Sequence, residues 1–275
     1  FFCFWSKRLG VYYQNKICWI TGASSGIGEA IAYELAKHGA HLVLSARSEA
    51  KLSQVAKRCM QYGAAETLIL PIDLGVPSII EDSFKSFQEK YTHIDLLINN
   101  GGISQRAVAA ETNSDVERNI MEVNYFGTIY LTKLVMPILM RQKSGQLAVT
   151  SSIAGKFGFP LRTSYSASKH AVQGYFESLR TELLPYNIGV NIIIPGRVRT
   201  EISKHALDGK GTATETMDKG LDEGISPEIA AKKIVRDLSK GKKEILVGGK
   251  ELLMVFIRRY TPWLFYKIVS RISPT

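Results

Sequence analysis

A tyrosine and a lysine four residues apart, Tyr165 and Lys169, have the spacing of a proton-transfer pair. On a helix, residues i and i+4 lie on one face, one turn apart. An unperturbed tyrosine has a pKa of about 10, so its phenol exchanges protons poorly at neutral pH. A cation held beside it stabilises the phenolate and lowers that pKa. The pair therefore predicts an acid–base centre, and an ordinary surface pair on an amphipathic helix is the alternative.

A glycine-rich segment near the start of the chain predicts a dinucleotide site. Residues 16–21 form a short apolar, β-prone run that is typical of a buried strand. Three glycines follow within residues 22–28, and residues 29–38 have an amphipathic helical pattern closed by Gly39. In such a unit the glycines let the backbone approach a pyrophosphate, and the helix N-terminus offers free N–H groups. This context favours a cofactor site over a plain turn.

The end of the second predicted strand, over residues 41–46, bears on which dinucleotide is bound. Folds that bind NAD carry an acid at this strand end, where it holds the ribose 2′-hydroxyl. Here Ala46 takes that place, and Arg47 follows and can pair with a 2′-phosphate. The alternative is a surface arginine that opens a helix over residues 48–61. We expect NADP(H).

Strands and helices alternate along the rest of the chain. Further strands are predicted over residues 67–73, 96–99, 146–151, 189–194 and 244–247. Helices are predicted over 77–91, around Tyr165 and from Ser226, and a long helical stretch over 115–141 is interrupted near Pro137. This alternation predicts an α/β fold with a doubly wound parallel sheet, the Rossmann fold, in a single domain. Residues 197–225 break the alternation and predict a lid or a disordered loop.

The length and composition fit one large α/β domain. We divide the 275 residues into an apolar and basic arm (1–15), a catalytic domain (16–249) and an amphipathic tail (250–275). No run is expected to be long and apolar enough to cross a bilayer. The three cysteines, Cys3, Cys18 and Cys59, are far apart and predict neither a disulfide framework nor a zinc site. The five histidines are scattered as well, so we expect no metal.

The net charge of +10 makes nucleic acid or an anionic membrane surface a possible partner. No acid follows Glu251, whereas four basic residues do, and this favours a surface-binding tail over nucleic acid. Pro262 separates two apolar helical stripes in the tail, which predict packing on a partner subunit or, by a small margin, binding in a membrane interface. The stripes are Leu253, Phe256, Ile257 and Tyr260, then Leu264, Phe265, Ile268, Val269 and Ile272.

The other end of the chain begins with Phe1 rather than Met, so we expect the native start to lie upstream. Residues 1–8 fit either the end of a hydrophobic anchor with a basic flank or a short apolar arm that packs on the body. We expect a location in the cytoplasm or on a cytosol-facing membrane, the endoplasmic reticulum if the source is eukaryotic.

Several motifs in a fixed order over residues 16–247 resemble those of the short-chain dehydrogenase/reductase family. One departure is Gly101, where the family more often has alanine. Within the family, the sequence looks like the dehydrogenase/reductase member 7 group and its bacterial relatives. The matching motifs are Thr21-Gly22-xxx-Gly26-x-Gly28, Asn99-Asn100-Gly101-Gly102, Asn124, Ser152, Tyr165-xxx-Lys169, and Pro195-Gly196 with Val198 and Thr200.

The resemblance implies a role for each matched residue. Tyr165 would exchange a proton with the substrate oxygen, and Ser152 would hydrogen-bond that oxygen. Lys169 would lower the tyrosine pKa and bind the nicotinamide ribose, and Asn124 would hold a water for proton resupply. As ordinary structural residues, Ser152 would be a strand-end cap and Asn124 a helix-bend residue. The implied cofactor-binding residues are Gly22, Ser24, Ser25, Gly26, Ile27, Gly28, Arg47, Asp73, Leu74, Asn100, Gly101, Tyr165, Lys169, Pro195, Gly196, Val198 and Thr200.

The resemblance implies an NADP(H)-dependent oxidoreductase that acts on a carbonyl or secondary alcohol. We expect the substrate to be lipophilic and the protein to form a homodimer or homotetramer. The main alternative is a cofactor-binding interaction module at a membrane surface with little turnover. A third reading, an epimerase or dehydratase of the extended branch, requires glycine at the position of Ser25 and a longer substrate domain, and the sequence has neither.

Overall fold

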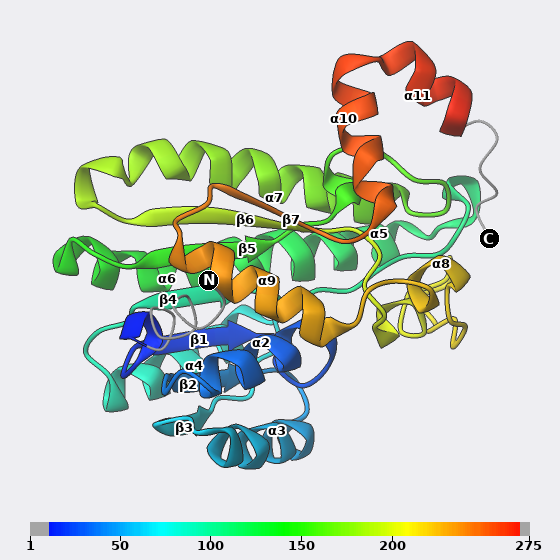
Figure 1. The fold of residues 1–275 in the computed structure, drawn as a ribbon. Helices are drawn as coiled ribbons and strands as arrows, with labels where there is room; N and C mark the ends of the chain where they lie inside the picture. The colour runs from blue at the N-terminus through cyan, green and yellow to red at the C-terminus, as the bar shows by residue number, and fades with distance from the viewer. Residues whose placement is uncertain (1–10, 270–275) are drawn as a thin grey trace.

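A seven-stranded parallel sheet forms the centre of the molecule in the computed structural model, which describes residues 11–269 (Figure 1). Its strand order is β3-β2-β1-β4-β5-β6-β7, and every neighbouring pair runs parallel. The doubly wound parallel sheet predicted from the sequence is confirmed. The strands are β1 (Ile17–Thr21), β2 (His41–Ser45), β3 (Glu66–Ile69), β4 (Leu96–Asn99), β5 (Gln146–Thr150), β6 (Gly189–Pro195) and β7 (Glu244–Val247).

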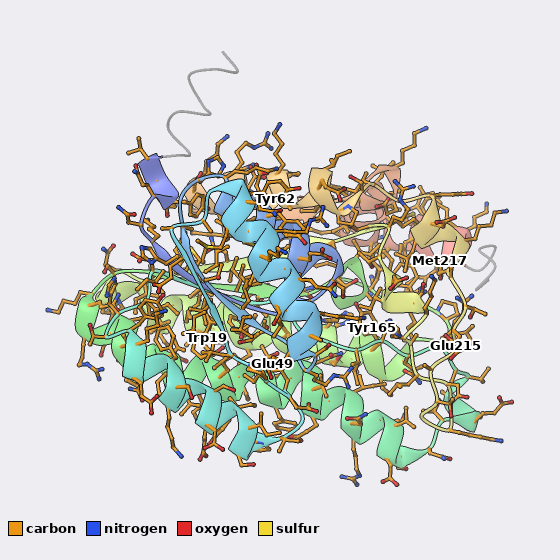
Figure 2. The ribbon with its side chains drawn as sticks, turned by 90° about the horizontal axis from the view of Figure 1, so that it is seen from below. Trp19, Glu49, Tyr62, Tyr165, Glu215 and Met217 are labelled. Carbon is orange, nitrogen blue, oxygen red and sulfur yellow. The ribbon has the colours of Figure 1, made fainter. Side chains whose placement is uncertain are left out.

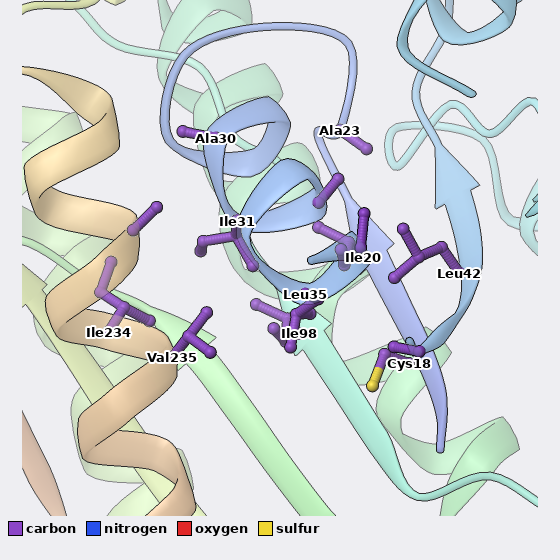
Figure 3. Packing of buried hydrophobic residues seen from close by; sticks show 14 of the residues in the cluster. Cys18, Ile20, Ala23, Ala30, Ile31, Leu35, Leu42, Ile98, Ile234 and Val235 are labelled. Carbon is purple, nitrogen blue, oxygen red and sulfur yellow. The ribbon is translucent and has the colours of Figure 1, made fainter. Parts of the chain in front are cut away.

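Helices cover both faces of the sheet. Alternate residues of a strand point to opposite faces, so Cys18 and Ile20 of β1 pack under α2, α3 and α9, whereas Trp19 packs under α4, α6 and α7. Figure 3 shows the first layer, in which Ile31 and Leu35 of α2 lie beside α9 and the sheet. The longer helices are α2 (Gly26–Ala36), α3 (Glu49–Tyr62), α4 (Pro77–Lys90), α5 (Ser114–Met121), α6 (Gly127–Gln142), α7 (Thr163–Glu182) and α9 (Pro227–Ser239).

The third strand is shorter than predicted, because β3 ends at Ile69 rather than Asp73. Pro71 has no N–H and interrupts the ladder. The backbone on either side still pairs with β2 and the residue after it: Leu70 N donates to Leu44 O at 3.0 Å, and Ile72 N donates to Ala46 O at 3.1 Å. The extended chain therefore still delivers Asp73 and Leu74 to the end of the sheet.

The long helical stretch is continuous through Pro137, so the predicted interruption there is wrong. The irregularity is instead a π-helical turn, η2 (Glu122–Phe126), between α5 and α6. Around Pro137, the side chains of Val135, Ile138 and Leu139 are buried in the core, and this packing holds the helix together despite the missing N–H.

The same stretch, Ser114–Gln142, is long and apolar enough by length and composition to cross a membrane. This finding corrects the expectation that no run would qualify. Because α6 packs against α4 and β4 in this fold, the stretch has the place of a core helix.

Residues 197–225 form an ordered segment between β6 and α9. It contains a 3₁₀ turn, η5 (Glu201–Ser203), and the short helix α8 (Lys219–Asp222). Its backbone pairs with the loop after β4, where Leu207 bridges to Gln105. The part of the chain predicted as a lid or disordered loop is therefore attached to the loop that follows β4. The remaining 3₁₀ turns are η1 (Ala109–Glu111), η3 (Ile153–Gly155), η4 (Leu184–Tyr186) and η6 (Lys250–Leu252).

The tail folds into two helices, α10 (Leu253–Tyr260) and α11 (Pro262–Val269), which lie near the start of α7, at the upper right of Figure 1. Phe265 is buried against Phe157, with ring centroids 5.0 Å apart. Leu253, Phe256 and Tyr260 face outward, whereas Ile257 of the same predicted stripe packs on the core. The predictions for residues 1–10, including Cys3, and for Ile272 lie outside the described residues.

Candidate active site

The site forms where the strand order reverses, between β1 and β4. At this point the loops that leave the two strands diverge, and in open α/β sheets ligands bind in the crevice so created. Thr21, the last residue of β1, joins the loops: its Oγ1 accepts from Asn100 N and from Gly101 N, each at 3.0 Å. A cavity of about 880 Å³ opens here and extends under the 197–225 segment and the tail.

The glycine turn after β1 leaves room for a phosphate-bearing ligand. Gly22 has a φ of +65°, and a Cβ added there would lie 2.8 Å from Gly101 Cα. Any side chain would therefore both strain the turn and force the two loops apart. The N-terminus of α2, which starts at Gly26, opens into the same cavity. A bare backbone cradle at a helix N-terminus fits the pyrophosphate of a dinucleotide.

The predicted site residues converge on one place. All of them line the cavity except Gly28 and Asn124, which lie behind its wall. Those that line it are Gly22, Ser24, Ser25, Gly26, Ile27, Arg47, Asp73, Leu74, Asn100, Gly101, Ser152, Tyr165, Lys169, Pro195, Gly196, Val198 and Thr200.

Tyr165 and Lys169 lie one turn apart near the start of α7. Figure 2 shows Tyr165 in the region between Glu49, at the start of α3, and Met217 of the 197–225 segment. Lys169 is buried, its Nζ donates to Thr150 O at 2.9 Å, and it lies 5.8 Å from the centroid of the tyrosine ring. The helix thus aims both groups at the carboxyl end of β5.

The ionisation of this pair differs from the simple expectation. Burial raises the pKa of Tyr165, while a hydrogen bond with Ser152 and the charge of Arg162 lower it. Burial also lowers the pKa of Lys169, from 10.5 to about 8. The influence that opposes burial at the phenol thus comes from Ser152 and Arg162, and the Lys169 ammonium is directed to the Thr150 carbonyl.

Ser152 and Asn124 are held by short-range hydrogen bonds. Ser152 caps η3, where its Oγ accepts from Ala154 N at 3.1 Å. Asn124 lies on the π-helical turn, which turns its side chain inward. Its Oδ1 accepts from Ile103 N at 2.8 Å, and its Nδ2 donates to Ile103 O at 2.9 Å and to Ser168 Oγ at 3.0 Å. The π turn and the loop after β4 thereby become one rigid unit beside Lys169.

Gly101, where the family more often has alanine, lies at the cofactor end of the cavity. A Cβ there would lie 2.8 Å from Leu74 Cδ1 and 3.3 Å from Thr21 Oγ1. Leu74 therefore takes up the space that an alanine methyl would need. The departure at Gly101 therefore concerns the fit of Leu74 at the dinucleotide site.

Sequence reasoning missed a charged cluster at the other end of the cavity. Arg162 pairs with Asp218 at 2.6 Å, and Arg106 lies 3.6 Å from the same carboxylate oxygen. Glu251 of the tail was missed as well, and its Oε1 accepts from Arg197 N at 2.7 Å. The two partners in each of these contacts are more than fifty positions apart, so no local pattern could have grouped them. Among the described residues, no group of histidine, cysteine and acidic side chains could hold a metal ion.

A glycine cradle at the switch point of a parallel sheet, beside a Tyr–Lys pair and a serine, defines a dinucleotide-dependent oxidoreductase of the Rossmann class. Residues 16–211 match the family model described as short chain dehydrogenase, and the chain belongs to that family.

Relatives from animals carry matching family names. The chain is 36% identical over 269 residues to dehydrogenase/reductase SDR family member 7B of Xenopus laevis, covering 96% of this chain and 83% of that protein. It is 38% identical over 264 residues to dehydrogenase/reductase SDR family member 7 of Homo sapiens, covering 94% and 78%. The resemblance to the member 7 group that the motifs indicated is thus confirmed.

Solved structures show the same fold. A short-chain dehydrogenase/reductase from Burkholderia phymatum in complex with NAD superposes with a TM-score of 0.81 at 22% identity, covering 96% of this chain and 97% of that one. An alcohol dehydrogenase from Thermococcus sibiricus complexed with 5-hydroxy-NADP gives a TM-score of 0.73 at 27% identity, covering 86% and 97%.

Proposed function

We propose that this protein interconverts a lipophilic carbonyl compound and its secondary alcohol with NADP(H), and that Tyr165 is the general acid/base. The observation that carries the proposal is the common cavity. The phenol of Tyr165, the hydroxyl of Ser152 and the ammonium of Lys169 line the same space as the glycine cradle. The two solved structures that hold NAD and 5-hydroxy-NADP support a nicotinamide dinucleotide in that space.

In the direction of reduction, a nicotinamide dinucleotide held at the glycine cradle would supply the hydride that the carbonyl carbon takes up. Tyr165 gives its phenolic proton to the carbonyl oxygen, so that the C=O bond becomes C–OH. The Ser152 hydroxyl donates to that oxygen while negative charge develops on it. The phenolate is stabilised by its hydrogen bond with Ser152 and by the charge of Arg162 until a proton from solvent restores the phenol. Oxidation of the alcohol uses the same groups in reverse.

Asn124 has a supporting role in this scheme. A Cβ added to Gly102 would lie 2.9 Å from Asn124 Oδ1 and 3.4 Å from Lys169 Nζ, so both atoms face the same small space. An amide oxygen there can hold a water beside the ammonium and connect it to solvent. An interaction module with little turnover needs none of these four side chains in this arrangement, which favours the enzyme.

The preference for NADP(H) rests on the end of β2. Ala46, Arg47 and Lys51 line the cavity there, so the ribose 2′ position would meet two cations instead of a carboxylate. A guanidinium binds phosphate through paired N–H donors.

The proposals of a lipophilic substrate and of a membrane contact are both based on the structure of the tail. Its inner face supplies Met254 and Val269 to the cavity wall, next to Phe157 and Phe159. On its outer face, Leu253, Phe256, Tyr260, Trp263 and Tyr266 are exposed. Exposed apolar and aromatic side chains with basic neighbours are typical of helices that lie in a membrane interface.

We infer a homodimer or homotetramer that pairs through the long helices, which the exposed Phe126 between α5 and α6 supports. The catalytic unit would span residues 16–249, and the tail residues 250–275.

Replacing Tyr165 with phenylalanine tests the central proposal. Tyr165→Phe keeps the ring but removes the hydroxyl, so turnover of NADPH with a panel of carbonyl compounds should fall about 10²–10⁴-fold, the usual contribution of a general acid. Cofactor affinity, measured by NADPH fluorescence, should change little. Tyr62→Phe, on the exposed side of α3, is the matched control and should keep wild-type turnover. Near-normal turnover by Tyr165→Phe would show that the phenol is not the acid.

A further inference from the structure

The substrate end of the cavity holds two arginines and one carboxylate that come from three separate segments. Arg106 belongs to the loop after β4, Arg162 directly precedes α7, and Asp218 caps α8 in the 197–225 segment. All three side chains line the cavity and are mostly buried, with exposed fractions of 17%, 23% and 17% respectively.

Asp218 accepts hydrogen bonds from two groups other than Arg106. Its Oδ2 accepts from Arg162 Nη2 at 2.6 Å, and its Oδ1 accepts from Leu221 N at 3.2 Å. The distance of 3.6 Å from Arg106 Nη1 to Oδ2 is too long for a hydrogen bond. Within residues 11–269, the Nη1 atom of Arg106 is buried and has no hydrogen-bond partner.

The other acids near this end are also engaged. Glu201 pairs with Lys204 at 3.0 Å, and Glu251 accepts from the backbone N–H groups of Arg197 and Gly249. A buried guanidinium nitrogen with no acceptor is costly for a fold to retain. Two guanidiniums and one carboxylate therefore line this end of the cavity, which leaves an excess of one positive charge where a substrate would bind.

We propose that the substrate carries an anionic group, a carboxylate or a phosphate, which Arg106 binds while the carbonyl lies at Tyr165. This inference rests on the proposed function and names the class of its substrate. Between the two polar ends, the chain of the substrate lies against the apolar side chains of Phe157, Leu207 and Leu221. The lipophilic carbonyl compound is thereby narrowed to an anionic amphiphile.

The proposed anion site and the catalytic phenol line the same cavity. Arg162 lies three residues before Tyr165, and its charge is among the causes that lower the pKa of that phenol. Because Arg162 and Arg106 approach the same Asp218 oxygen, Arg106 lies in the same neighbourhood.

A comparison of oxo acids with their methyl esters tests the proposal by turnover. We would measure kcat/KM with NADPH for 4-oxopentanoate, 5-oxohexanoate, 6-oxoheptanoate and their methyl esters, a series that varies the distance from carbonyl to anion. The best acid should exceed its ester by about 10-fold to 100-fold, the range of a charge-assisted hydrogen bond. Arg106→Met should bring this ratio close to one. Arg141→Met, which removes an exposed arginine at the end of α6, should keep it. An acid-to-ester ratio near one in the wild type would overturn the proposal.

A purely structural role for Arg106 predicts a different result. Its backbone N donates to Leu207 O at 2.8 Å, and this bond survives the substitution. If Arg106 only supported the 197–225 segment, Arg106→Met would lower the melting temperature and reduce the turnover of acid and ester alike. An unchanged ratio in this variant therefore counts against the anion site.

A binding measurement separates failure of this inference from failure of the proposed function. Calorimetric titration of the NADP⁺-bound protein with hexanoate, hexyl phosphate and methyl hexanoate needs no turnover. Tighter binding of an anion than of the ester, lost in Arg106→Met, supports the site even if no carbonyl is reduced, and the preferred anion identifies carboxylate or phosphate. Equal affinity for all three, or anion binding that survives Arg106→Met, overturns it.

Discussion

Arg47 and Ala46 are the residues on which the proposed cofactor preference depends. Arg47→Ala should lower kcat/KM with NADPH by about tenfold or more, because a charge-assisted bond to the 2′-phosphate is lost, and should leave the value with NADH nearly unchanged. Ala46→Asp should shift the preference toward NADH, because a carboxylate repels the phosphate and accepts from the 2′-hydroxyl. Kinetics with both cofactors provide the measurement. Lys57→Ala, an exposed change on α3 outside the cavity wall, is the control. An NADH preference in the wild type would contradict the proposal.

The lowered pKa of Lys169 makes the free energy of unfolding depend on pH. Its pKa is about 8 in the folded chain and 10.5 in the unfolded one, so between these values the unfolded chain binds more protons and stability rises with pH. Lys169→Met lacks this effect. The unfolding free energy of the wild type should therefore rise relative to the variant between pH 8 and pH 10.5, by on the order of 3 kcal/mol, as urea titrations can measure. Lys57→Met, at an exposed site, should run parallel to the wild type. A constant difference between wild type and Lys169→Met would contradict a depressed lysine pKa.

The outer face of the tail is the element on which the proposed membrane contact depends. Phe256→Ser combined with Trp263→Ser removes two of its exposed rings and should reduce co-sedimentation with anionic liposomes at low salt. Because basic residues add a screened attraction, wild-type binding should also weaken as salt shortens the Debye length from about 10 Å at 0.1 M. Ile229→Ser removes an equally exposed apolar side chain from α9 and should not matter. If the wild type stays in the supernatant while the double variant breaks an oligomer, the tail is a subunit contact.

Arg258 of the tail makes a contact that the sequence pattern could not predict. The guanidinium of Arg258 lies 5.6 Å from the centroid of Phe265 and 5.1 Å from that of Tyr266. It therefore joins α10 to α11 by stacking on aromatic rings. The sequence analysis took the basic residues after Glu251 as a sign of a surface-binding tail, and for Arg258 this contact between α10 and α11 is a second role.

Elements with a strong local pattern were predictable. Seven strands and the helices between them follow from apolar periodicity, and Ser226 with Pro227 indicated the start of α9, where Ser226 Oγ accepts from Ile229 N. The interruption predicted near Pro137 is absent, because core packing can hold a helix across one missing hydrogen bond. The π turn at Asn124 has no signature of its own, so the residue was found through a family motif and not through its geometry.

For the whole molecule, sequence order indicated which loops share a sheet edge, but not which side chains meet. The glycine turn and the loop after β4 could be placed together from the parallel alternation alone. Arg106, Arg162 and Asp218 could not, because their meeting depends on how residues 197–225 fold back over the cavity. The pKa of Lys169 also follows from three-dimensional burial, which the spacing to Tyr165 does not encode.

The hydrogen bonds of Glu251 link the tail to the backbone after β6, which is the segment that we expect to contact the cofactor. Its Oε1 accepts from Arg197 N at 2.7 Å and from Gly249 N at 2.9 Å, so the first turn of the tail secures the backbone that follows Pro195 and Gly196. If a dinucleotide orders that backbone, it strengthens the attachment of the tail, and a surface that orders the tail tightens dinucleotide binding by the same free energy. A chain cut at residue 250 would lose both at once, and its loss of liposome binding could then be mistaken for a loss of lipid contact alone.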